Sequence, residues 1–261
     1  DLCFSVFPWA LFRSTKSAVK LHTLLDLRGN IPSFVHISVG KLHDVNALDM
    51  IIPEAGSFYV MDRGYLDFER LFSLNNAGTF FVIRSKNNIL FKRRYSQPVD
   101  KSNGVQCDQT ISLIGLNTKN KYPKPLRRVK YHDNETDKTL NLLNNNEVIS
   151  PQTVADLYRY RWKVELFFKW IKQHLRIRSF LGTSENAVKS QIWIAITVYV
   201  LIAIIKKQLK IKAELYTILQ VLSLTLFEKM PLEQLLGNEH YITHIRENAI
   251  QLNLLDNLSG H

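Results

Sequence analysis

Residues 156–178 have the sequence DLYRYRWKVELFFKWIKQHLRIR, and this stretch dominates the fold and the chemistry expected of the chain. Its spacing predicts one long helix, with Ser150 as the N-cap and Pro151 at the first helical position. At about 100° per residue, four polar side chains share roughly 60° of the helix surface: Tyr158, Arg161, Glu165 and Lys172. An apolar stripe lies beside them and consists of Leu157, Val164, Phe168, Ile171 and Leu175.

This polar face has two interpretations. A glutamate and a lysine two turns apart on an exposed helix are often simply solvated charges. Alternatively, the aromatic and apolar flanks partly bury Glu165, and a partly buried carboxylate needs a cationic partner or a metal ion. Spacing alone leaves both interpretations open.

Composition and charge restrict the class of partner. The chain has 261 residues, enough for a full hydrophobic core, and its formal net charge of +11 favours a polyanionic partner, either nucleic acid or a membrane surface. Its 2 cysteines cannot form a disulfide framework or a four-cysteine zinc site, so we expect a cytoplasmic protein. The apolar run 192–205 is shorter than the ~20 residues of a membrane span, so we expect a buried helix and no membrane partner.

The first part of the chain predicts an α/β layer around a mixed sheet. We expect a β-hairpin over residues 18–26 and 31–39, with a turn at 28–30. His22 and His36 would face each other across it in a structural role. The elements expected next are a short helix at 45–52, a strand at 58–61, a helix at 66–75 and a strand at 79–84.

Residues 86–150 differ in character, and we expect an inserted β subdomain there. Turn signals separate four expected strands at 89–95, 105–113, 126–132 and 139–143. The many lysines and arginines of this segment either contact DNA or protect a sheet edge. The expected organisation is therefore 1–85 as the first part of the core, 86–150 as the insertion, 151–210 as helices that complete the core, and 211–261 as a helical tail.

Two carboxylates stand out as candidate metal ligands. Asp62 follows the expected buried strand at 58–61, and open α/β sheets place their sites at the carboxyl ends of strands. Glu165 could lie beside it, and a carboxylate pair of this kind holds Mg²⁺ with positions left for phosphate and water. Tyr158, Arg161 and Lys172 could then grip phosphates. Asp62 could equally be an ordinary turn residue.

The spacing Tyr158, Arg161, Glu165, Lys172 resembles the Y-R-E-K signature of DDE transposases of the insertion-sequence-four group, which have a ribonuclease-H-like core. The run YVMDRGY around Asp62 resembles the second-aspartate motif of that group, and the hairpin segment 20–30 and the segment 165–172 are also similar. The resemblance covers nearly the whole chain, and the gap between Asp62 and Glu165 accommodates the β-rich insertion of the family.

The resemblance implies a role for each of these residues. Asp62 and Glu165 would be the second and third metal-binding carboxylates, with Mg²⁺ as cofactor and Mn²⁺ as a substitute. Tyr158, Arg161 and Lys172 would hold phosphates of the transposon end. The implied partners are double-stranded DNA, at the element's ends and at the target, and a second copy in a synaptic complex near the bacterial nucleoid.

The first catalytic aspartate of the family has no clear counterpart. Asp1-Leu2-Cys3-Phe4 lacks the hydroxyl residues that follow that aspartate, and Asp1 is a poor replacement. We expect an N-terminally truncated chain whose first aspartate lies upstream, so the fragment could be inactive. The leading hypothesis is a transposase catalytic domain that cleaves and transfers DNA strands. The alternatives are a non-catalytic DNA-binding remnant and a structure-selective nuclease on the same fold. His240 and His244 lack an evident third zinc ligand.

Overall fold

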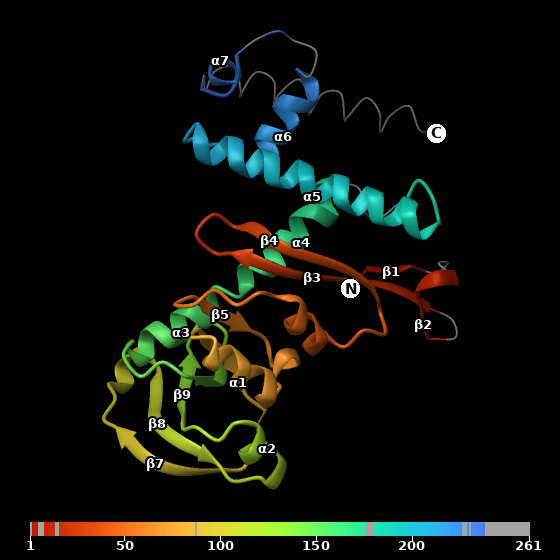
Figure 1. Ribbon diagram of the computed structural model, residues 1–261. Coiled ribbons are helices and arrows are strands. Elements are labelled where there is room, and N and C mark those ends of the chain that lie inside the picture. The colour runs from red at the N-terminus through yellow and green to blue at the C-terminus, as the bar shows by residue number, and fades with distance from the viewer. Residues whose placement is uncertain are drawn as a thin grey trace.

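The structure is a computed structural model that describes residues 2–4, 8–13, 16–86, 88–175, 180–225, 229 and 231–237. Figure 1 shows a sheet with its covering helices in the lower part of the molecule, a long hairpin above it, and a helical layer above the hairpin. One helical segment, drawn in green, connects the lower part to the helical layer. The predicted site residues belong to this connecting segment and to the edge of the lower sheet.

A long antiparallel hairpin forms the middle of the molecule. Its strands are β3 (Lys16–Asp26) and β4 (Ile31–Val39), and the short strands β1 (Leu2–Phe4) and β2 (Leu11–Arg13) also pair with β3. Asn30 ends the turn with a φ of 53°, a left-handed conformation that asparagine tolerates. His22 and His36 are directly opposite each other, with ring centroids 6.1 Å apart, so this cross-strand prediction is confirmed.

The lower sheet is mixed and has six strands in the order β5-β6-β10-β9-β8-β7. β5 and β6 are parallel, joined through α1 (Phe68–Asn76), and the other neighbours are antiparallel. Leu71 of α1 packs against Phe81 and Ile83 of β6, and all three are fully buried. The strands are β5 (Phe58–Met61), β6 (Phe80–Arg84), β7 (Phe91–Gln97), β8 (Val105–Leu113), β9 (Leu126–Asp133) and β10 (Lys138–Asn144).

The predicted α/β class, with a mixed sheet flanked by helices as in a ribonuclease-H-like fold, is confirmed. The segment 86–150 forms the four predicted strands, a 3-10 helix (Lys101–Asn103) and the short α-helix α2 (Leu116–Lys121). Its strands do not form a separate sheet, because β10 pairs with β6 and so continues the sheet that carries Asp62. The segment expected as a short helix at 45–52 is a 3-10 helix, Asp44–Met50.

The prediction of one helix through 156–178 is wrong. α3 (Pro151–Arg159) and α4 (Trp162–His174) are separate, and residues 176–178 lie outside the described part. Between them the backbone tightens, because Arg161 N–H donates to the carbonyl of Tyr158 and Val164 N–H to that of Arg161, three residues back. The two helices face different cores. α3 packs on the six-stranded sheet through its buried Val154, Ala155 and Tyr158, whereas α4 packs on the hairpin and α5 through Phe167 and Ile171.

The upper layer begins with α5 (Glu185–Gln208), followed by α6 (Leu215–Leu224) and α7 (Leu232–Gly237). α5 is long and apolar enough to cross a membrane by length and composition, but core helices of soluble proteins pass the same test. It is buried where Ile192, Ile196 and Tyr199 pack against the hairpin and α4, and where Ile202 packs against α6. The expected buried helix is therefore only partly buried, because Trp193 and Ile194 are exposed. Residues 238–261, which include His240 and His244, lie outside the described residues.

Candidate active site

Asp62 lies at the carboxyl end of the buried strand β5, at the start of a tight 3-10 turn. One of its carboxylate oxygens accepts a hydrogen bond from the Arg63 N–H, as expected of a turn residue. The carboxylate also lies 3.8 Å from the Arg161 guanidinium, and 52% of the side chain is exposed. Asp62 therefore caps the turn, as one interpretation of the sequence predicted, and it also faces Arg161 at the start of α4, while its role as a metal ligand stays a prediction.

Arg161 joins the two predicted metal-binding carboxylates. Its Nη1 is 2.7 Å from Glu165 Oε1 and 3.8 Å from Asp62 Oδ2. Because both distances end on the same nitrogen, the two carboxylates lie beside the same end of one guanidinium. The tightened turn between α3 and α4 makes this possible, since it places Arg161 immediately before the helix that carries Glu165.

The guanidinium of Arg161 is held by ion pairs, but one of its N–H groups makes no hydrogen bond within the described residues. Burial tends to lower the pKa of Arg161, but the hydrogen bond to Glu165 and the nearby Tyr158, Glu165 and Asp62 together raise that pKa above its usual value. Within the described part of the chain, the buried Nε of Arg161 has no hydrogen-bond partner. A buried donor without an acceptor costs free energy, so this position suits an incoming anionic oxygen.

Two tyrosine hydroxyls border the carboxylates. Burial, with a smaller contribution from Asp62, raises the pKa of Tyr158, and its ring lies 5.8 Å from the Arg161 guanidinium. Burial together with the charges of Asp44 and Asp62 raises the pKa of Tyr65 to about 12. Both hydroxyls therefore keep their protons at neutral pH and can donate hydrogen bonds.

Lys172 is placed differently from the other predicted residues. It is half-buried on α4, two turns beyond Glu165, about 10 Å along the helix axis. Within the described residues, no three His, Cys, Asp or Glu side chains are close enough to hold a metal ion, and Asp1 lies outside those residues.

A groove with a volume of about 830 Å³ runs beside the site, and the sequence did not single out several of its residues. Arg84 follows Ile83, which is paired with Met61, so Arg84 and Asp62 emerge from neighbouring parallel strands. Trp162 is 56% exposed at the start of α4. A signal for Arg84 was present in the sequence: if the expected strands at 58–61 and 79–84 pair in parallel, their carboxyl ends place Arg84 beside Asp62. The groove also includes Lys138, Tyr158, Arg159, Tyr160, Arg161 and Lys163.

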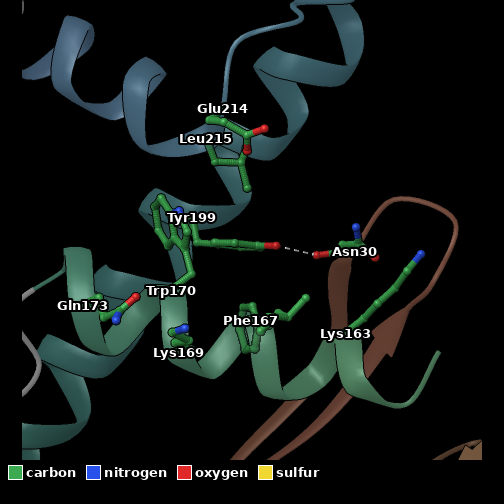
Figure 2. Close-up of a pocket in the computed structure, with 10 residues that line it drawn as sticks. Asn30, Lys163, Phe167, Lys169, Trp170, Gln173, Tyr199, Glu214 and Leu215 are labelled. Atoms are coloured by element: carbon green, nitrogen blue, oxygen red, sulfur yellow. Dashed lines mark hydrogen bonds between the residues drawn. The ribbon is translucent and has the colours of Figure 1, made fainter. Parts of the chain in front are cut away.

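A second pocket, of about 390 Å³, adjoins this groove at Lys163 and Leu166. Figure 2 shows that it lies between the hairpin turn, α4, α5 and the start of α6. The Tyr199 hydroxyl donates a 2.9 Å hydrogen bond to the Asn30 carbonyl, and Lys163 Nζ donates one of 3.2 Å to the Leu27 carbonyl. These two bonds tie the hairpin turn to α4 and α5, and so fix the position of the helix that carries Glu165.

Comparison with known proteins gives one family match. Residues 13–201 match the family model described as "Transposase DDE domain". The matched range includes the hairpin, Asp62, the β-rich segment, and the whole of α3 and α4.

Similar proteins carry transposase names. "Putative transposase y4zB" of Sinorhizobium fredii is 32% identical over 225 residues, covering 85% of this chain and 63% of that protein. "Probable transposase for insertion sequence element IS5377" of Geobacillus stearothermophilus is 33% identical, covering 78% and 53%. "Putative transposase for insertion sequence element IS4SA" of Synechocystis sp. is 26% identical, covering 72% and 53%. The chain thus spans between about half and two thirds of the length of these relatives.

Proposed function

This chain belongs to the transposase DDE domain family, and from that premise we propose that it performs DNA strand cleavage and strand transfer at the ends of an insertion sequence. The observation that carries the proposal is the meeting of Asp62 and Glu165 at one nitrogen of Arg161. Residues from the end of β5 and from the first turn of α4, far apart in the sequence, come together there.

The carboxylate pair suits a divalent cation. Carboxylate oxygens are the hard donors that Mg²⁺ takes, and both side chains are about half exposed, so solvent and substrate can reach them. Asp62 and Glu165 would hold Mg²⁺, with Mn²⁺ as a substitute. When bound, such an ion supplies Lewis-acid polarisation of the phosphate and activation of the attacking oxygen.

The remaining residues act on the phosphate itself. Arg161 donates from its Nε, which is buried and unpartnered within the described part, to a phosphate oxygen. The protonated Tyr158 hydroxyl donates a second hydrogen bond beside it. Lys172, two turns along α4, neutralises a neighbouring phosphate of the same DNA end. Held in this way, the strand presents its phosphate to water for cleavage, and a freed 3′-hydroxyl then attacks target DNA.

The partners follow from this chemistry. They are double-stranded DNA of the element ends and of the target, and a second transposase copy when two ends are paired. The groove beside Arg161 has Arg84, Lys138, Arg159, Arg161 and Lys163 in its lining, together with Asp133, Glu135 and Asp156. This excess of cations over carboxylates supports contact with DNA next to Asp62 and Glu165. We place the protein in the cytoplasm, with access to the nucleoid.

Substitution Glu165→Gln tests the proposal in the complete transposase polypeptide. It removes one ligand charge but keeps the size of the side chain, so strand cleavage should be lost while binding of element ends persists. Glu147→Gln, at an exposed position in the loop before α3, is the matched control and should cleave normally. Cleavage by Glu165→Gln at the parent rate would sink the assignment of Glu165.

A further inference from the structure

The turn between β9 and β10 is acidic, although it borders a groove that is otherwise rich in cations. Residues 133–137 have the sequence DNETD, and we call them the acidic turn. The acidic turn contributes Asp133 and Glu135 to the groove lining, and the last turn of α3 contributes Arg159. Because α3 packs on β9 and β10, the acidic turn and the end of α3 lie at the same part of the groove.

The backbone of the acidic turn is held in place, whereas the side chain of Glu135 lies largely in solvent. Asp133 is buried, and its carboxylate accepts hydrogen bonds from the Glu135 N–H at 3.1 Å and from the Thr136 hydroxyl at 2.9 Å. The Glu135 side chain is 76% exposed. It can therefore change direction without disturbing the two strands that the turn connects.

Glu135 forms an ion pair with Arg159. The distance between Glu135 Oε2 and Arg159 Nη2 is 2.8 Å, and the Arg159 side chain is 40% exposed. Carboxylate and phosphate oxygens bind a guanidinium through the same planar set of N–H donors. Exposed ion pairs between side chains are weak, so a phosphate that enters the groove can displace the carboxylate.

We propose that Arg159 is a phosphate-binding residue, and that Glu135 occupies the place of the phosphate until DNA enters the groove. Arg159 and Arg161 both line the groove, so the backbone of one bound DNA can reach both. Binding at Arg159 then exchanges one ion pair for another, and the gain in affinity is smaller than that from an unpaired arginine. The acidic turn thereby limits how tightly this basic groove holds DNA.

The inference rests on the proposed function, because it requires DNA in the groove beside Asp62 and Glu165. It concerns the affinity for DNA and not strand cleavage, so the two are tested separately. A parent chain that binds DNA, with no improvement from Glu135→Gln, would overturn this inference and leave the test of Glu165 unaffected. A parent chain without affinity for DNA would contradict both.

Glu135→Gln tests the competition for Arg159, because it removes the charge and nearly keeps the size of the side chain. The affinity of the 261-residue chain for a labelled double-stranded oligonucleotide, measured by fluorescence anisotropy, should rise roughly two- to fivefold. Asp137→Asn is the matched control, since it changes the net charge equally on the same turn. Asp137 is 96% exposed, lies beside His132, and has a φ of 52° that asparagine tolerates. Equal gains from the two variants would overturn the inference.

Arg159→Gln shows whether the gain depends on the arginine. In the Glu135→Gln background, adding Arg159→Gln removes one phosphate contact, so the slope of log affinity against log salt should fall by about one. In the Arg159→Gln background, Glu135→Gln should raise affinity no more than Asp137→Asn does, because no guanidinium is left to release. An unchanged slope, or a gain from Glu135→Gln that is equally large without Arg159, would overturn the inference.

Discussion

At the scale of single residues, the geometry of the site depends on one arginine. Arg161 contacts both Asp62 and Glu165, lies over the Tyr158 ring, and keeps a buried Nε available. A planar guanidinium can serve several acceptors at fixed angles, whereas an ammonium is a point charge on a flexible stem. The fixed geometry of the Arg161 guanidinium and its positive charge can therefore be tested separately.

Arg161→Lys separates them experimentally. Lysine keeps the positive charge but lacks the planar set of N–H donors of the guanidinium, so we expect DNA binding to change little. Strand cleavage should fall by roughly 10- to 100-fold, because small displacements of reacting groups slow the reaction. The measurement is single-turnover cleavage of a labelled element end in the complete polypeptide. Arg28→Lys, 88% exposed in the hairpin turn, is the control and should cleave as the parent does. Unchanged cleavage by Arg161→Lys would show that the planar guanidinium geometry of Arg161 has no role in cleavage.

At the scale of elements, a buried ion pair sets where α3 begins. Arg127 of β9 is paired with Asp108 of β8 at 2.8 and 2.7 Å, and its other nitrogen donates to the carbonyls of Asn146 and Ile149. Those carbonyls lie just before Ser150, whose hydroxyl caps α3 by accepting from the Thr153 N–H. The strands of the β-rich segment thus hold the N-terminus of the helix that leads to Arg161.

Arg127→Met tests this anchor. Asp108 would stay buried without a counter-charge, so the free energy of unfolding should fall by about 3–5 kcal/mol, measured by urea denaturation. The double variant Asp108→Leu/Arg127→Met removes both charges and should recover part of that loss. A single variant within about 1 kcal/mol of the parent would mean that the pair contributes little.

At the scale of the whole molecule, the net charge of +11 and an exposed basic edge strand act together. β7 forms the edge of the six-stranded sheet, and its Lys92, Arg93 and Arg94 follow one another. The strand pairing is irregular between Arg93 and Tyr95, a feature that protects sheet edges from aggregation. Edge protection and DNA contact therefore both remain explanations for these cations.

The salt dependence of DNA binding distinguishes them. If about six or more phosphates are contacted, affinity for double-stranded DNA should fall by ~10³-fold or more between roughly 50 and 200 mM salt. If Arg93 contacts a phosphate, Arg93→Gln should reduce the slope of log affinity against log salt by about one, and Lys119→Gln on α2 should not. An equal slope for parent and Arg93→Gln would favour edge protection, and a flat response of the parent would contradict DNA binding.

The sequence by itself determined the strands of the hairpin and of the sheet, and it singled out the residues that we propose for the site. Alternation of apolar residues predicted the first hairpin strand, and the turn at 28–30 predicted its partner. Short apolar runs predicted β5 and β6, because local patterning depends on which face of an element is buried. The spacing of Tyr158, Arg161, Glu165 and Lys172, with the motif around Asp62, led to the family that the match over residues 13–201 then established.

Only the tertiary structure decided how these parts meet. The helical pattern is interrupted between α3 and α4 because α3 packs on the six-stranded sheet and α4 packs on the hairpin and α5. No local feature of the sequence at Tyr160 or Arg161 indicates that the two helices belong to different hydrophobic cores. The pairing of β10 with β6 is likewise a long-range contact. The meeting of Asp62 and Glu165 at Arg161 depends on both, since residues distant in sequence become neighbours only when packing fixes the elements that carry them.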